Sequence, residues 1–231
     1  MAPVKGLLIT VGVLVVLLVA ADRVGVLLAE DQVAAQVAAQ GQLAGEPEVD
    51  ITGFPFLTQA VAGRYDDVRI SLTADELGQP AGTSADVSLQ GVRLPLSDVL
   101  GGQVSQLPVD RVDGRASVPY DLLAAQLGGD TTLTREGDGL RITKTVEVLG
   151  QTIPLTAAGQ VALDGQDLVV TVDSAAGAGI DVPDFLLDQA QDLLDFRYTL
   201  PALPFGLQLT GLQTTDGGVD VTVAATDVVL Q

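Results

Sequence analysis

The strongest pattern in the chain is an apolar run at the N-terminus, where residues 6–21 carry no charge. Lys5 precedes the run and Asp22-Arg23 follows it. A basic residue before an apolar run holds the N-terminus in the cytoplasm and directs the following chain outward. The run has sixteen residues, fewer than the roughly 20 that span a hydrocarbon core as a helix. It therefore predicts either a cleaved secretory signal, with Val19-Ala20-Ala21 as the cleavage site, or a short uncleaved membrane anchor. Both alternatives predict that the rest of the chain is extracytoplasmic, either membrane-anchored or released.

A helical pattern follows in residues 24–44, which are rich in Ala and Gln. Apolar residues recur there at helical spacing, and Gly45-Glu46-Pro47 is expected to end the helix. Residues 120–127 and 183–196 predict two further helices, and the second is amphipathic with a proline at its start.

Beyond residue 47 apolar and polar residues alternate, which is typical of half-buried β-strands. Glycine-containing turns at 136–139, 164–165 and 216–218 predict hairpins, because glycine adopts a positive φ without strain. The predicted strands cover residues 68–73, 87–94, 109–118, 131–135, 140–149, 152–163, 168–172, 206–214 and 219–230. The predicted fold class is α+β, with long curved antiparallel β-sheet meanders, a long N-terminal helix and a C-terminal amphipathic helix. We expect residues 1–29 to form the signal or anchor and residues 30–231 to form a single domain.

The aliphatic strand faces predict an elongated interior that is either a filled apolar core or a lipid groove. A filled core is the ordinary outcome for such strands. Two features favour a groove: few aromatic side chains are present to fill a wide interior, and an exported protein meets apolar ligands at the membrane. The sequence leaves both alternatives open.

Composition narrows the function classes. All 30 acidic residues and ten of the 11 basic residues follow Ala21, so the exported part carries a net charge of −20. This charge repels nucleic acid and anionic surfaces. The chain has no Cys and no His, which removes disulfides, the commonest metal ligand and nucleophile–histidine pairs. Since no carboxylate pair stands out either, we expect a protein that is not an enzyme, with no cofactor and no metal site.

Two motifs combine phenylalanine with proline: Gly53–Gln59 and Leu200–Leu207. Proline cannot donate to a β-ladder, so both motifs are expected at a strand edge or at the end of a sheet. They could be hydrophobic corners that seal the core, or they could rim a lipid entrance. The rim interpretation gives these candidate lipid-binding residues: Phe54, Phe56, Leu57, Arg64, Tyr65, Arg197, Tyr198, Leu203 and Phe205. Arg64 and Arg197, each beside a tyrosine, are the expected neighbours of a lipid headgroup.

Four segments carry a resemblance to a known family: Ile51–Gln59, Gly63–Tyr65, Thr145–Gly150 and Leu200–Leu207. From about residue 30 to its C-terminus, the chain resembles the LmeA-type family of actinobacterial phospholipid-binding proteins of the cell envelope. The resemblance implies an exported envelope protein that binds phospholipid without catalysis. It also implies a fold similar to the tubular lipid-binding superfamily, with a curved sheet around a long helix. The member that typifies the family is linked to mannan polymerisation, but membership alone does not imply that this chain acts on lipoglycan; support of envelope lipid or lipoglycan assembly is kept as a hypothesis.

Two functions follow as hypotheses. In the first, the protein binds phospholipid or another acyl lipid at the outer leaflet of the cytoplasmic membrane, held by apolar burial. In the second, it is an envelope scaffold that recruits a membrane enzyme without holding lipid. A filled interior favours the scaffold, and extractable lipid favours the lipid-binding protein.

Overall fold

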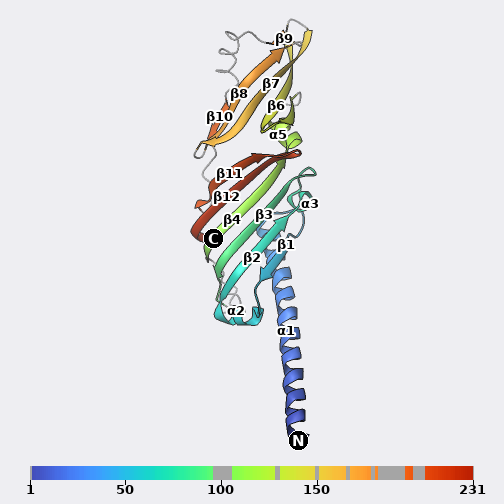
Figure 1. The fold of residues 1–231 in the computed structure, drawn as a ribbon, viewed down its shortest axis with the longest axis vertical. Helices are drawn as coiled ribbons and strands as arrows, with labels where there is room; N and C mark the ends of the chain where they lie inside the picture. Colours follow the sequence, from blue (N-terminus) through green and yellow to red (C-terminus); the bar gives the residue numbers. More distant parts are fainter. Residues whose placement is uncertain are drawn as a thin grey trace. The chain divides into compact units, whose positions relative to one another are not determined.

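A computed structural model describes residues 2–95, 106–127, 131–148, 151–164, 167–177, 180–181, 196–199 and 206–230 (Figure 1). Its helices are α1 (Ala2–Gly41), α2 (Phe56–Ala62), α3 (Ala74–Leu77) and α5 (Tyr120–Leu127). Its strands are β1 (Glu48–Thr52), β2 (Arg64–Leu72), β3 (Ser84–Arg93), β4 (Leu107–Pro119), β5 (Thr131–Glu136), β6 (Gly139–Val148), β7 (Gln151–Asp164), β8 (Asp167–Gly177), β9 (Ile180–Asp181), β10 (Phe196–Thr199), β11 (Gln208–Thr214) and β12 (Gly218–Leu230). The α+β fold class with a long N-terminal helix is confirmed.

The apolar run and the predicted helix after it form one continuous helix, α1, of 40 residues. Asp22-Arg23 does not interrupt it, since neither residue breaks a helix as proline does. The helix ends at Gly41, and the next residue, Gln42, takes a positive φ of 51°. The end therefore comes before the predicted stop at Gly45-Glu46-Pro47. Residues Leu7–Gly41 are long and apolar enough to cross a membrane, a property that a signal sequence shares.

The strands form two sheets with orders β1-β2-β3-β4-β12-β11 and β10-β8-β7-β6-β5, and β9 pairs with β8. The predicted hairpins are confirmed: β5 pairs antiparallel with β6, β7 with β8, and β11 with β12. The amphipathic helix predicted at residues 183–196 lies outside the described residues, except that Phe196 begins strand β10. The helix at residues 183–195 stays a prediction.

The chain divides into two compact units, and the first sheet contributes strands to both. Unit 1 consists of Met1–Leu72, Val87–Val112 and Thr226–Gln231, and unit 2 consists of Thr73–Asp86 and Asp113–Ala225. The single domain predicted for residues 30–231 stays a prediction.

The interior of each unit is mainly aliphatic. In unit 1, α1 packs on β1, and Val26 and Ala34 of α1 are 6% and 7% exposed. Glu30 Oε1 accepts a hydrogen bond from the Ile51 backbone N–H at 2.9 Å, which fixes the strand against the helix. The buried cluster of unit 2 joins α5 to both sheets and consists of Tyr120, Ala124, Leu133, Leu140 and Val219.

Candidate functional site

The motif at Gly53–Gln59 forms a helical corner between β1 and β2. Its expected place at the end of a sheet is correct, but the chain there forms the helix α2, which the sequence analysis missed. Pro55 is the N-cap residue, with a φ of −77° that suits a helix start. Gly63 ends α2 in the left-handed conformation, with a φ of 65°. A Cβ at Gly63 would also lie 2.8 Å from Pro95 Cα, so only glycine fits. We call residues 53–64 the α2 corner.

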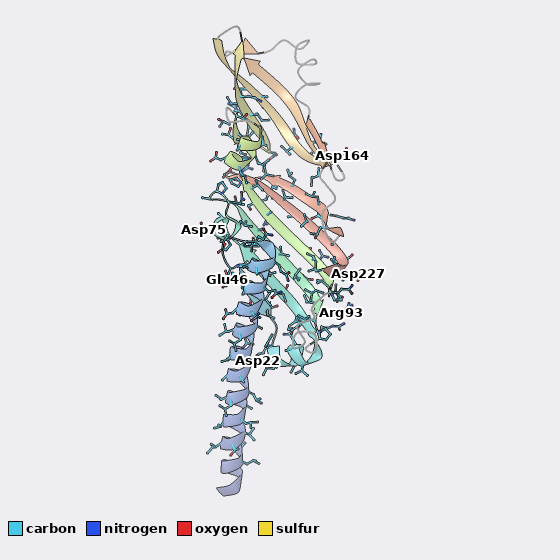
Figure 2. The ribbon with its side chains drawn as sticks, turned by 180° about the vertical axis from the view of Figure 1, so that it is seen from behind. Asp22, Glu46, Asp75, Arg93, Asp164 and Asp227 are labelled. Carbon is cyan, nitrogen blue, oxygen red and sulfur yellow. The ribbon has the colours of Figure 1, made fainter. Side chains whose placement is uncertain are left out.

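Asp22 of α1 caps α2 from a distance in the sequence. Pro55 has no side chain that could cap the helix. Instead, the Leu57 backbone N–H donates a hydrogen bond to Asp22 Oδ1 at 2.8 Å. Arg23 Nη2 donates to the other carboxylate oxygen, Oδ2, at 2.8 Å. Asp22 is only 2% exposed, so its charge is met by these partners rather than by solvent. Figure 2 shows Asp22 on α1 at the level of α2.

The predicted residues of this corner divide into a buried pair and an exposed set. Phe56 and Tyr65 are 6% and 9% exposed, and their ring centroids lie 6.1 Å apart. Burial raises the pKa of the Tyr65 phenol above its ordinary value. Phe54 and Leu57 are 64% and 38% exposed, and Arg64 is exposed as well. The first two side chains therefore pack the corner, and the other three form its surface.

A glutamine closes the corner internally. Gln59 Nε2 donates to the Thr52 carbonyl oxygen at 3.2 Å, and Gln59 Oε1 accepts from the Asp66 backbone N–H at 2.9 Å. Gln59 thus links the end of β1 to the start of β2, so the α2 corner is fixed where the chain enters it and where the chain leaves it.

The C-terminal candidate residues belong to unit 2. Arg197 and Tyr198 lie in β10, opposite Val169 and Leu168 of β8. Leu203 and Phe205 lie outside the described residues, as does the rest of the second phenylalanine–proline motif except Gly206 and Leu207.

The structure reveals apolar positions that the sequence analysis did not single out. In the β11–β12 hairpin, Leu209 pairs with Val223 and Leu212 pairs with Val221. All four side chains are only partly buried. We call these four residues the β11–β12 apolar face. The apolar–polar alternation of β12 was their signal, but alternation does not reveal that the apolar side is incompletely covered.

The opposite side of the same hairpin is polar. Thr210 Oγ1 donates to Thr222 Oγ1 at 3.3 Å. Ser117 Oγ donates to Asp220 Oδ1 at 2.7 Å, and Arg115 forms an ion pair with the same carboxylate at 3.5 Å. The hairpin is therefore amphipathic across the sheet.

The second sheet contributes a similar surface within unit 2. Leu133 of β5 pairs with Ile142 of β6. Ile142 and Val161 are partly buried and pack against the buried cluster of unit 2, as Leu212 and Val221 do from the first sheet. Apolar side chains from both sheets thus pack against the five buried residues of unit 2, and these surrounding side chains are only partly covered.

Polar contacts fix one end of this apolar region. The Tyr120 hydroxyl donates to the Thr215 carbonyl oxygen at 2.7 Å. Thr214 Oγ1 donates to the Asp138 carbonyl oxygen at 3.0 Å, and Arg135 Nη1 lies 2.8 Å from Asp216 Oδ1. These contacts tie the β11–β12 turn to α5 and to the β5–β6 turn, so the two sheets are held together there.

Within the part of the chain that the structure describes, no group of three or more His, Cys, Asp or Glu residues could hold a metal ion. Several of the described carboxylates serve in caps and surface ion pairs, such as Arg69–Asp67 at 2.8 Å. What the described geometry offers chemically is apolar surface.

Comparison with protein families gives a match over residues 20–224, to the model described as LmeA-like phospholipid-binding. A search of curated proteins and a search of solved structures each found no match.

Proposed function

The chain belongs to the LmeA-like phospholipid-binding family, and from this premise we propose that it holds phospholipid without catalysis at the outer face of the cytoplasmic membrane. The single observation that carries the proposal is the incompletely covered apolar surface of unit 2. The family is a lipid-binding one and is not a known enzyme family. Support of envelope lipid or lipoglycan assembly is the biological role that we attach to this binding.

The partly covered side chains suit an acyl chain. Apolar side chains on the two sheets of unit 2 pack against one cluster yet keep part of their surface open. Each methylene group that an acyl chain buries on such a surface contributes about 0.8 kcal/mol. About ten buried methylene groups would contribute about 8 kcal/mol, which corresponds to a Kd of about 1 μM, and they need no charged partner.

The charge of the protein constrains the headgroup. With a net charge of −20 after Ala21, the surface as a whole disfavours an anionic headgroup. We therefore propose that the headgroup stays in solvent beside an arginine. Arg64 is exposed at the α2 corner, and Arg197 of β10 is the corresponding residue of unit 2.

The test is titration of fluorescent phosphatidylcholine into a detergent-free fragment that begins at Asp22. The fragment must include Asp22 and Val26, because both are buried in the fold of unit 1. The expected result is saturable binding that is unchanged in 1 M salt, where the Debye length falls to about 3 Å and surface charge attraction is lost while apolar burial is retained.

The proposal would be contradicted if the fragment is folded and binds no phospholipid at either salt concentration. In that case the scaffold hypothesis, in which the chain recruits a membrane enzyme, would explain the family's presence in the envelope without lipid binding.

A further inference from the structure

The position of α2 along α1 is fixed by direct contacts. Asp22 Oδ1 accepts the Leu57 backbone N–H at 2.8 Å. A Cβ placed on Gly25 would lie in ordinary contact with Leu57 at 3.4 Å and with Phe56 at 3.5 Å, so α2 lies against α1 at this residue. The α2 corner is thus held at the level of residues 22–25 of α1.

This level coincides with the outer boundary of a bilayer that contains the apolar run. At about 1.5 Å per residue, residues 6–21 span about 24 Å, which is about 6 Å less than a hydrocarbon core of about 30 Å. Residues 22–25 supply the missing length of about 6 Å. The segment that completes the span is therefore the segment against which α2 packs.

The exposed surface of the α2 corner is apolar. Phe54, Leu57 and Val61 are 64%, 38% and 79% exposed. On α1, Val24, Leu27 and Leu28 are likewise 57%, 60% and 66% exposed. These three residues of α1 follow the exposed apolar side chains of residues 7–19 along the same helix.

The α2 corner also lacks acidic residues. Residues 53–64 contain no Asp and no Glu, and their one charged residue is Arg64, although the chain has 30 acidic residues. An acidic protein that rests on a membrane needs one surface free of negative charge. The α2 corner itself adds no negative charge, and the exposed carboxylate of Asp66 lies at its edge beside Gly53.

The charged pair at residues 22–23 is compatible with this depth. Asp22 is 2% exposed and is hydrogen-bonded by Leu57 and Arg23. The Arg23 guanidinium lies 5.3 Å from the centroid of the Phe54 ring, so an aromatic face covers it. A long basic side chain with an aromatic neighbour suits the boundary between hydrocarbon and headgroups.

We infer that the α2 corner docks into the outer leaflet of the bilayer that holds α1, with Phe54, Leu57 and Val61 as the inserted side chains. This inference rests on the proposed location of the chain. It deepens that proposal, because it names the surface through which the protein meets the lipid that it binds.

The chain contains no tryptophan, so a single substitution provides a unique fluorescent probe. Full-length variants Leu14→Trp, Val61→Trp and Gln40→Trp are reconstituted in phosphatidylcholine vesicles that carry bromine either near the headgroup or near the end of the acyl chain. Leu14 lies within the uncharged run and reports insertion of α1. Gln40 is an exposed residue of the same helix, about 22 Å beyond Gly25 at 1.5 Å per residue, and is the matched control.

For the Val61→Trp variant we expect strong quenching by bromine near the headgroup and a blue-shifted emission, as for an element buried about 5–10 Å into the boundary region. The Gln40→Trp variant is expected to show neither. The Phe54→Trp variant gives an independent reading from the other end of the α2 corner, before the helix begins.

Two results would overturn the inference. In one, the Val61→Trp and Phe54→Trp variants are as unquenched as Gln40→Trp in vesicles where Leu14→Trp is quenched. In the other, Leu14→Trp itself is unquenched, so that α1 does not stay in the bilayer. Either result leaves phosphatidylcholine binding by the fragment that begins at Asp22 as a separate readout, so a failure of docking is distinguished from a failure of the proposed function.

Discussion

Replacement of Val221 by threonine tests whether an acyl chain covers the β11–β12 apolar face. Val221 is partly buried, pairs with Leu212 and packs against the cluster of unit 2. Threonine has nearly the same shape as valine and a similar preference for strands. In the lipid-free protein the new hydroxyl group can still reach water, so the fold should be retained.

The cost arises when lipid binds. An acyl chain over residue 221 would remove water from the hydroxyl group without providing a hydrogen-bond partner, which costs about 1–3 kcal/mol. Because about 1.4 kcal/mol corresponds to a tenfold change, the Kd for phosphatidylcholine should rise roughly 5- to 100-fold. The assay is titration of fluorescent phosphatidylcholine at one fixed salt concentration, with circular dichroism to confirm the fold.

Thr222→Val is the matched control. Thr222 is the next residue of β12, is also partly buried, and lies on the polar side, where its hydroxyl accepts a hydrogen bond from Thr210. The control replaces a hydroxyl group by a methyl group on the polar face of the strand, which is the reverse of Val221→Thr. Its Kd for phosphatidylcholine should equal that of the parent. A folded Val221→Thr variant with the parental Kd, or equal losses in both variants, would refute the reasoning.

Three further predictions concern the α2 corner and export. Phe56→Ala should lower the free energy of unfolding by about 3–5 kcal/mol because it empties a buried site, whereas Phe54→Ala should cost less than about 1 kcal/mol; equal shifts in denaturant midpoint would contradict the assigned burial. Burial raises the pKa of the Tyr65 phenol, so the folded state resists loss of the phenol proton. The resulting contribution to stability is fully present below the ordinary tyrosine pKa of about 10, and it is lost as the pH rises through the pKa of Tyr65 in the folded protein. The drop in unfolding temperature between neutral and strongly alkaline pH should therefore be smaller for Tyr65→Phe than for the parent. An equal drop in both proteins would contradict the assigned burial of Tyr65. A reporter that is active only in the cytoplasm should be silent when fused after Gln42, and strong activity would contradict export.

Local patterns in the sequence predicted most of the regular elements. Alternation and glycine turns located the β5–β6 and β11–β12 hairpins, because both signals lie within a few residues of the contacts that they specify. The helix at Tyr120–Leu127 also has the predicted bounds. Elements of this kind are determined by residues close in sequence.

Contacts between distant residues could not be predicted in this way. The Asp22 cap of α2 joins residues 35 positions apart, and the Ser117–Asp220 hydrogen bond joins residues 103 positions apart. The sequence therefore indicated that Phe54 and Phe56 share a motif but not that Phe56 is buried while Phe54 is exposed. Likewise, the alternation predicted a strand at residues 219–230 but gave no information on how completely the side chain of Val221 is covered.

The most direct test of phospholipid binding is mass spectrometry of organic extracts from the detergent-free protein that begins at Asp22, isolated from cells and washed in 1 M salt. The fragment should carry phospholipid in a fixed ratio to protein, and the Val221→Thr variant should carry less than the Thr222→Val variant. Folded protein whose extracts contain no phospholipid above the level of an unrelated protein purified in parallel would contradict the account.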